Sequence, residues 1–466
     1  MRTAEARRRS LEERLAHIDS AAGLIARYPE SLTDGAKKLL ETVGALTVIV
    51  RESLSRRWSR WDDAKDSNVR ESALRRLCDD YHDVVQDLGH LLIPVLEGAS
   101  PQYIPVEIEP IVQFVVERAA PTAALTSVLH STHRYNYSIA RVEQLAHDWF
   151  QELNPDLPVE EPMASSEARP LADDFVFVSA PRLERDSAPL HAVILGHELG
   201  HLRDWHHGVT DATDIQIPNV FLKGGQPTLD VVAKVDLFLD VSEAWLSEFV
   251  ADIFAAFLIG PAAVWALSEI TSILSPIDVD WDTHPGTDRR VSVMLDVLRS
   301  QEFDDRAAGL ATFFSEFGGE VDGAMDRPVD IANLVDNEPA QEAWSWIQSV
   351  LPGVIDRCRA TLAPDEAFEA SRWSEVVPAA DKLTGGFPCG EFADVGPVYT
   401  AASERVIINA AWLVKVARLK ELAEELGREG ESFDDLVAST LVLNDLVLKS
   451  FEIARYRRSI HGEPPE

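Results

Sequence analysis

The chain is poor in cysteine and has no long uninterrupted apolar run. Only three of its 466 residues are cysteines, namely Cys78, Cys358 and Cys389. They are far apart and form no C-x-x-C pair, so we expect no disulfide framework. The most apolar stretch, residues 249–267, contains Asp252 and is broken by Gly260 and Pro261. Because a membrane-spanning helix needs about 20 clean apolar residues, we expect a buried helix there and no membrane insertion.

Basic residues are also scarce. The sequence has 43 Lys and Arg against 78 Asp and Glu, which gives a formal net charge of -35. Such a surface repels phosphate backbones, so we expect no nucleic-acid partner. The N-terminal segment carries positive charge, but no apolar stretch follows it, and we expect no secretory signal. The expected location is the cytoplasm.

The residues that are present favour a large, mainly α (α+β) protein. Hydrophobic residues make up 46% of the sequence, and the length predicts roughly two to three domains. The spacing of Leu74, Leu77 and Tyr81 is typical of an amphipathic helix, and most of the first hundred or so residues show such a pattern. Residues 175–178 (FVFV) predict a short strand. Further helices are expected at 106–119, 136–153 and 401–427, with a loop at 384–396.

Residues 197–201 read HELGH and match the pattern H-E-x-x-H. The flanks predict a helix, with a cap, a first-turn proline and a terminating glycine at Ser187, Pro189 and Gly208. On a helix, His197 and His201 share one face, where both imidazoles can bind one metal ion. Glu198 projects beside that ion and can take a proton from water. With 13 histidines in the chain, the pattern alone would arise by chance in roughly a few per cent of such chains.

A second helix downstream strengthens this prediction. We expect it to begin with a capping box at Asp240 and Glu243 and to end at Gly260. It carries Glu248 and Asp252 four residues apart in an apolar run. Catalytic zinc takes three protein ligands and keeps an open position, so Glu248 completes a His₂Glu site, and Asp252 can fix the tautomer of a ligand imidazole. The alternative is a solvated helix face, but unpaired carboxylates in apolar surroundings are costly.

Together with these two helices, residues 283–291 (THPGTDRRV) resemble the gluzincin metallopeptidases, and most closely the family of the CAAX prenyl proteases and the heat-shock protease HtpX. The resemblance covers residues 170–300. It implies a zincin-like domain with one Zn²⁺ per chain, in which the ligands are His197, His201 and Glu248. It also implies that Glu198 is the general base and that Asp252 orients a histidine. Because many relatives are membrane-embedded and this chain shows no spanning helix, prenylated substrates are not carried over.

The same resemblance places His284 and Arg290 near the bound substrate or the developing oxyanion. The alternative for this pair is a buried cap that stabilises a turn. We divide the chain into a helical N-terminal region (1–125), a zincin-like metallopeptidase domain (126–305) and a helical C-terminal region (306–466).

The predicted reaction is the hydrolysis of peptide bonds in a peptide or protein substrate. Zinc polarises the scissile carbonyl and activates a water molecule, and Glu198 passes the water's proton to the leaving amine. Residues 175–178 are the candidate edge strand for pairing with the peptide. One alternative is a non-proteolytic regulatory or binding protein on a zincin scaffold with structural zinc. Another is an intracellular protease that serves a single regulatory protein partner and is idle until a signal arrives.

The remaining histidines are expected outside the metal site. His206 and His207 are interpreted as a C-terminal helix cap, and His191 falls on another helix face. His130 and His133 are interpreted as packing residues. Cys389 is a candidate for a thiolate that binds the zinc and keeps the enzyme latent, although a cysteine in a turn is more commonly inert.

Overall fold

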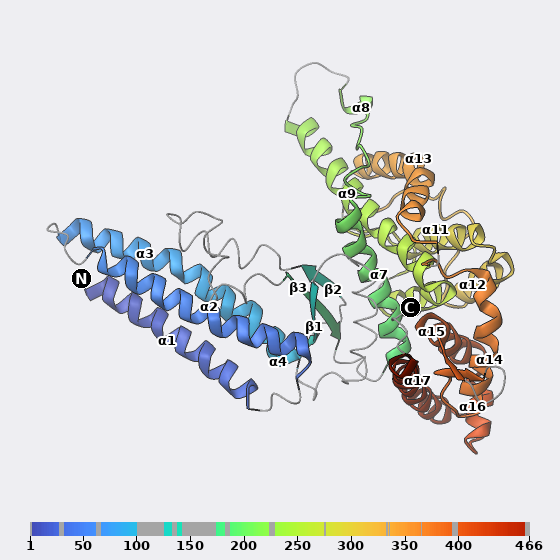
Figure 1. Ribbon diagram of the computed structural model, residues 1–466. Helices are drawn as coiled ribbons and strands as arrows, with labels where there is room; N and C mark the ends of the chain where they lie inside the picture. The colour runs from blue at the N-terminus through green and yellow to red at the C-terminus, as the bar shows by residue number, and fades with distance from the viewer. Residues whose placement is uncertain are drawn as a thin grey trace. The chain divides into compact units, whose positions relative to one another are not determined.

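The computed structural model of the protein is mainly helical with a small sheet, as predicted (Figure 1). It divides into two compact units: unit 1 comprises residues 1–113 and 122–185, and unit 2 comprises residues 114–121 and 186–466. This division differs from the three predicted regions, whose boundaries lay at 125 and 305. The structure describes residues 2–27, 32–61, 67–99, 125–132, 138–141, 174–181, 187–222, 229–274, 276–331, 334, 336–364, 366–393 and 399–461.

Unit 1 joins N-terminal helices to a small sheet. Its elements are α1 (Arg2–Ile25), α2 (Asp34–Ser59), α3 (Ser67–Asp87), η2 (Leu88–Leu92), α4 (Ile93–Gly98), β1 (Leu125–Thr132), β2 (Ser138–Arg141) and β3 (Asp174–Pro181). The apolar helix faces meet in one core that contains Leu15, Val43 and Tyr81, as the helical spacing predicts. Phe175 and Phe177 of β3 belong to the same core. The strands therefore group with the N-terminal helices and not with the predicted metallopeptidase domain.

Strand β3 lies in the middle of the unit 1 sheet. It pairs in parallel with β1 and antiparallel with β2, in the order β1-β3-β2. The strand predicted at 175–178 is confirmed, but its predicted role as a free edge is wrong, because hydrogen bonds to neighbouring strands occupy both of its edges. The helix predicted at 136–153 is wrong for residues 138–141, which pair with β3. The rest of that segment, and the helix predicted at 106–119, lie outside the described residues.

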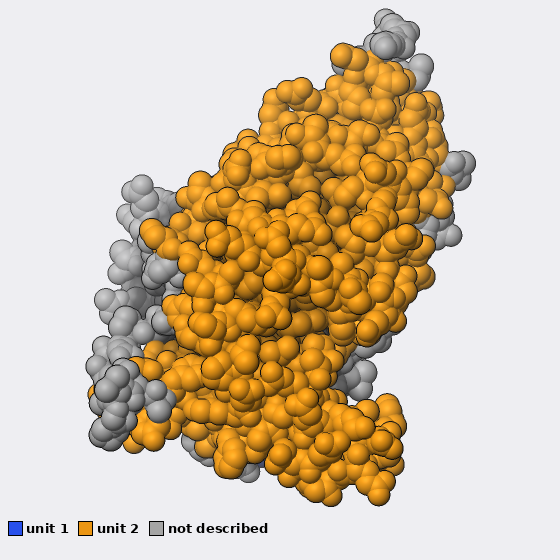
Figure 2. All heavy atoms as spheres, turned by 90° about the vertical axis from the view of Figure 1, so that its right-hand side faces the viewer, with its two compact units in different colours: residues 1–113, 122–185 blue, residues 114–121, 186–466 orange. Residues whose placement is uncertain are grey.

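The described residues of unit 2, which is drawn in orange in Figure 2, form helices and one antiparallel pair of strands, β4 and β5. Its elements are α7 (Ala188–His207), α8 (Asn219–Leu222), α9 (Leu229–Ile259), α10 (Pro261–Leu274), α11 (Thr287–Ser300), α12 (Asp304–Glu316), α13 (Glu338–Ala360), η7 (Ala370–Arg372), α14 (Trp373–Thr384), β4 (Glu391–Ala393), β5 (Tyr399–Ala401), α15 (Glu404–Leu413), η8 (Val414–Arg418), α16 (Leu419–Glu425) and α17 (Phe433–His461). The helical segment predicted at 401–427 is present as α15, η8 and α16. The loop predicted at 384–396 contains strand β4.

Helix α9 packs against α7, α11 and α13. From Phe238 onward most of its side chains are buried, because the apolar run is packed on several sides. The helix ends at Gly260 as predicted, with a φ of 81° that favours glycine. Its predicted start is wrong: the helix begins at Leu229, so Asp240 and Glu243 are exposed positions inside it and not a capping box. Among the described residues, no helix combines the length and apolar character that crossing a membrane requires.

Candidate metal centre

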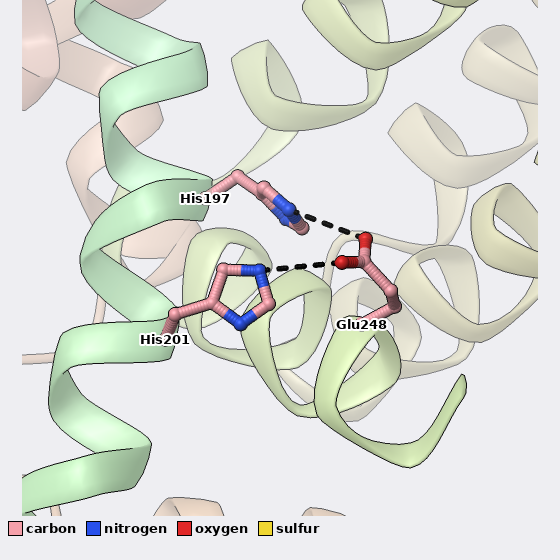
Figure 3. Close-up of side chains that lie close together, drawn as sticks. All are labelled: His197, His201 and Glu248. Atoms are coloured by element: carbon pink, nitrogen blue, oxygen red, sulfur yellow. Dashed lines mark ion pairs between the residues drawn. The ribbon is translucent and has the colours of Figure 1, made fainter. Parts of the chain in front are cut away.

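Three side chains from two helices of unit 2 point toward one another (Figure 3). His197 and His201 stand one turn apart on α7, with ring centroids 4.9 Å apart and ring planes at 84°. Glu248 of α9 faces both rings: its Oε2 lies 3.5 Å from Nε2 of His197, and its Oε1 lies 3.4 Å from Nε2 of His201. The helical spacing of H-E-x-x-H thus presents both imidazoles to one carboxylate.

The spacing of these donor atoms fits a small divalent ion. The three ligand atoms all lie within 4.8 Å of one another, and the group could hold a metal ion. Two ligands that each stand about 2.0–2.1 Å from an ion in tetrahedral geometry are about 3.4 Å apart. Each imidazole nitrogen lies at about that separation from one oxygen of the Glu248 carboxylate, His197 from Oε2 and His201 from Oε1. Within the described ranges, no other three His, Cys, Asp or Glu side chains form such a group.

Two glycines allow α7 to approach α9 closely enough for this contact. A Cβ atom on Gly200 would lie 2.6 Å from Cα of Ala251, and one on Gly196 would lie 2.8 Å from a side-chain carbon of Ile259. At Gly200 the clash is with backbone atoms, so glycine is required there, whereas at Gly196 the side chain of Ile259 would have to shift. The bounds of α7 agree with the prediction: Gly208 ends it with a φ of 60°, and Ser187 is its N-cap residue, although no capping hydrogen bond from that side chain is present.

Each imidazole has a second partner that orients it. Nδ1 of His197 lies 2.9 Å from Oδ1 of Asp252, a carboxylate that is only 1% exposed. Nδ1 of His201 lies 3.2 Å from the hydroxyl oxygen of Ser247. In both rings this leaves Nε2 to face Glu248, which is the arrangement by which metal-binding histidines are commonly fixed. Asp252 therefore lies where the sequence predicted it.

Arg290 lies on the buried side of the three ligands and not on their solvent side. It is buried, it donates to Asp252 from Nε at 2.7 Å and from Nη2 at 2.8 Å, and its Nη1 lies 3.3 Å from Oε2 of Glu248. Its Nη2 is also 3.4 Å from Nδ1 of His197. The guanidinium is thus engaged by two carboxylates, which favours a structural role for Arg290 over direct contact with substrate. This role differs from the predicted alternative, a buried pair that caps a turn, because Arg290 holds carboxylates of α9 and His284 is half exposed.

His284 is on the solvent side of the site. Its side chain is 53% exposed, and its Nε2 lies 3.5 Å from Oε1 of Glu248. Its Nδ1 lies 2.8 Å from the hydroxyl of Thr283. His284 is outside the group whose ligand atoms lie within 4.8 Å of one another. It can therefore meet a molecule that approaches the site without being one of the three converging ligands.

Buried charges of opposite sign set the electrostatics of the site. Burial by itself lowers the pKa of His197, but its hydrogen bonds to Asp252 and Glu248 outweigh this and raise the pKa to about 10. Burial raises the pKa of Glu248, yet Arg290 and the imidazoles lower it well below the usual range. Partial desolvation lowers the pKa of His284.

Glu198 follows the first imidazole on α7 and is partly buried. Its negative charge helps to raise the pKa of Arg290. Burial lowers that pKa, but the neighbouring carboxylates outweigh burial and raise it overall. Glu198 therefore belongs electrostatically to the same cluster of charges. This is the position at which the pattern H-E-x-x-H places its acid.

The other predicted residues lie apart from the centre. His206 and His207 are exposed in the last turn of α7, which is the position expected for them; their capping role stays a prediction. His130 lies in β1, with its ring against Phe177, which agrees with packing; His133 and the side chain of His191 lie outside the described residues. The proposed thiolate contact of Cys389 with the ion is wrong. This cysteine is fully buried, its backbone N–H donates to the hydroxyl of Ser450 in α17, and burial raises the pKa of its thiol to about 11.

Sequence reasoning missed several residues that shape the site. Gly196 and Ser247 are among them, together with a buried charged group around residues 280–290. The pattern Gly196-x-x-x-Gly200 could have predicted a close helix contact, since small residues at this spacing form a flat strip on one helix face. No comparable signal marks the charged group, whose partners are far apart in the sequence.

The chain matches no protein-family model, no curated protein and no solved structure.

Proposed function

We propose that the protein is a zinc-dependent endopeptidase of the gluzincin type. The observation that carries the proposal is the pair of distances, 3.5 and 3.4 Å, between the carboxylate of Glu248 and the imidazoles of His197 and His201. Two imidazoles and one carboxylate are a ligand set of catalytic zinc, whereas structural zinc sites are closed by four protein ligands. The resemblance of the three motifs to the family of the CAAX prenyl proteases and HtpX supports the same assignment.

When bound, zinc would supply a Lewis acid that lowers the pKa of a water molecule and polarises a substrate carbonyl. The proton is handled by Glu198, which stands next to a ligand on α7. Its carboxylate accepts the proton of the attacking water and delivers it to the nitrogen of the leaving amine as the C–N bond breaks. A new C–O bond on the carbonyl carbon replaces the broken bond, so the products are a carboxylate and an amine.

Two further residues complete the proposed centre. The partly exposed imidazole of His284 faces the approaching peptide and can donate a hydrogen bond to the oxygen on which negative charge develops. Arg290 holds Asp252 and Glu248 in place from the buried side. In this proposal Arg290 acts through the ligands, and His284 acts on the substrate.

The proposed substrate is a peptide or protein segment. With a net charge of -35, the chain is poorly suited to hold a nucleic acid. A cytoplasmic location and a regulatory protein partner are proposed together with this function, on the basis of the sequence alone.

Metal analysis and a cleavage screen test the proposal together. We expect one zinc per chain in the purified wild type and in Glu198→Gln. We also expect the wild type to cleave members of a mixed peptide library, detected by mass spectrometry, and Glu198→Gln to lose this activity. Glu243→Gln, which changes an exposed acid on α9, is the matched control and should cleave like the wild type.

Two outcomes would overturn the assignment. A chain without zinc would remove the metal centre itself. A zinc-loaded chain that cleaves no peptide, or that cleaves equally well as Glu198→Gln, would leave a structural ion on a binding scaffold.

A further inference from the structure

A buried cluster of charged residues holds the segment that carries His284 and Arg290. The segment runs from Asp280 to the first turn of α11. Asp280 is fully buried; its Oδ1 accepts the backbone N–H of Gly286 at 2.8 Å, and Nε of Arg289 at 3.1 Å. One carboxylate thus ties the start of the segment to a residue beyond its tip, which closes the segment into a loop.

Arg289 extends the cluster to a distant stretch of chain. Its side chain is fully buried, and its Nη atoms donate to the backbone oxygens of Ala324 at 3.0 Å and Arg327 at 2.8 Å. The guanidinium lies 4.6 Å from the ring centroid of Trp344 on α13. A buried arginine that donates to several acceptors and lies against an aromatic ring is held firmly in place.

The side chain of Arg327 pairs with two carboxylates of the loop. Its Nε lies 3.0 Å from Oδ2 of Asp288, and its Nη1 lies 3.2 Å from Oδ2 of Asp280. Gly286 has no room for a side chain here, because a Cβ would lie 2.6 Å from Asp288, 2.8 Å from Arg327 and 3.0 Å from Asp280. The guanidinium of Arg327 therefore joins both ends of the loop from outside it.

The tip of the loop is secured by its backbone and reaches the metal centre. The N–H of Trp281 donates to the backbone oxygen of His284 at 2.9 Å. The indole Nε1 of Trp245, on α9 one turn before Glu248, donates to the backbone oxygen of Trp281 at 2.8 Å. The imidazole of His284 extends from this tip to within 3.5 Å of the Glu248 carboxylate. The position of this imidazole thus depends on the loop, which Arg327 holds at both ends.

We propose that Arg327 is a positioning residue, which holds the 280–290 loop so that His284 stands beside Glu248. The inference rests on the proposed function for its catalytic consequence but not for its structural part. The hydrogen bonds of the Arg327 side chain go to Asp280 and Asp288, and none goes to a proposed zinc ligand. It therefore acts on the reaction through His284, and zinc binding should be indifferent to it.

Amide hydrogen exchange of the zinc-loaded chain tests the structural part without any substrate. In Arg327→Met, peptides covering residues 281–290 should exchange at least about tenfold faster, whereas peptides of α7 and α9 should keep their protection. Arg299→Met is the matched control, since Arg299 forms an exposed ion pair with Asp296 on the same helix, α11. Unchanged exchange at 281–290 in Arg327→Met would overturn the proposal.

Kinetics with the library peptide that the wild type cleaves fastest test the catalytic part. We expect Arg327→Met to lower kcat about ten- to a hundredfold with little change in KM and unchanged zinc content. In a His284→Ala background the same change should have almost no further effect, because both substitutions remove one function. Equal losses in both backgrounds would show that Arg327 only supports the fold, and would overturn the proposal.

A conservative variant guards against a chain that does not fold. Arg327→Lys keeps the charge but cannot reach both carboxylates with a planar fork, so it should fold and show intermediate exchange and kcat. If the wild type cleaves no peptide while exchange at 281–290 responds as expected, the proposed function fails and the positioning of the loop stands. Exchange at 281–290 in Arg327→Lys no faster than in the wild type would show that the contact of one guanidinium with both carboxylates does not hold the loop, contrary to the proposal.

Discussion

Arg290 donates two hydrogen bonds to Asp252, one from Nε at 2.7 Å and one from Nη2 at 2.8 Å. Asp252 in turn lies 2.9 Å from Nδ1 of His197. A cation, a carboxylate and an imidazole thus form a buried chain that ends at a proposed zinc ligand. The orientation of that ligand depends on residues that do not themselves face the ion.

Replacing Asp252 with Asn should weaken zinc binding about 10–100-fold. The amide lacks the negative charge that orients His197, and it leaves Arg290 without its main ion pair. Competition with a zinc chelator of known affinity measures the change. The control is Asp236→Asn, an exposed position of α9, which should bind zinc like the wild type. Equal affinities for both variants would mean that Asp252 does not support the ligand.

Gly200→Ala should push α7 and α9 apart. The new Cβ would lie 2.6 Å from both Cα and the backbone oxygen of Ala251, so we expect a loss of about 1–3 kcal/mol in the free energy of unfolding together with weaker zinc binding. Gly309→Ala on α12 is the matched control, because a Cβ there meets nothing within 4 Å. It should stabilise the chain by about 0.5–1 kcal/mol.

Urea unfolding of both glycine variants, followed by circular dichroism, separates the two cases. A Gly200→Ala chain as stable as the wild type would show that the helices do not cross closely at this point.

The stability of unit 1 should fall as the pH decreases from 6.5 to 4. Burial lowers the pKa of His130 from 6.5 to about 4, so in this range the unfolded chain binds a proton that the folded chain does not. Stability is therefore fully present above pH 6.5 and is lost toward pH 4, by at most about 3 kcal/mol. Urea unfolding at a series of pH values measures the slope.

His130→Phe should reduce this slope, because the group that takes up the proton is gone. His17→Phe, at an exposed position of α1, should keep the slope of the wild type. A slope in His130→Phe as steep as in the wild type would contradict the assignment.

Much of the site could be predicted because its residues lie close together in the sequence. His197 and His201 are one helical turn apart, so their convergence follows from helix geometry alone. The pairing of Asp252 with an imidazole followed from a carboxylate in an apolar helix, which needs a partner. That Glu248 faces the imidazoles was expected from the ligand count of zinc and from the resemblance, since local spacing cannot bring two separate helices together.

The errors arose where distant contacts decide the structure. Asp240 and Glu243 have the spacing of a capping box, yet the preceding residues continue the helix to Leu229. The strand at 175–178 was correct in type, but its central place depends on pairing with β1 and β2. The cluster of Asp280, Asp288, Arg289 and Arg327 was not foreseen, because charged residues are ordinarily exposed and only the folded chain shows their burial.

Zinc K-edge X-ray absorption of the purified, zinc-loaded chain shows which atoms surround the ion and so tests the His₂Glu centre itself. We expect one ion surrounded by nitrogen and oxygen at about 2.0–2.1 Å, with the outer scattering of two imidazoles, and a loss of the ion in Glu248→Ala. A sulfur neighbour at about 2.3 Å, a single imidazole, or zinc retained unchanged in Glu248→Ala would contradict this expectation.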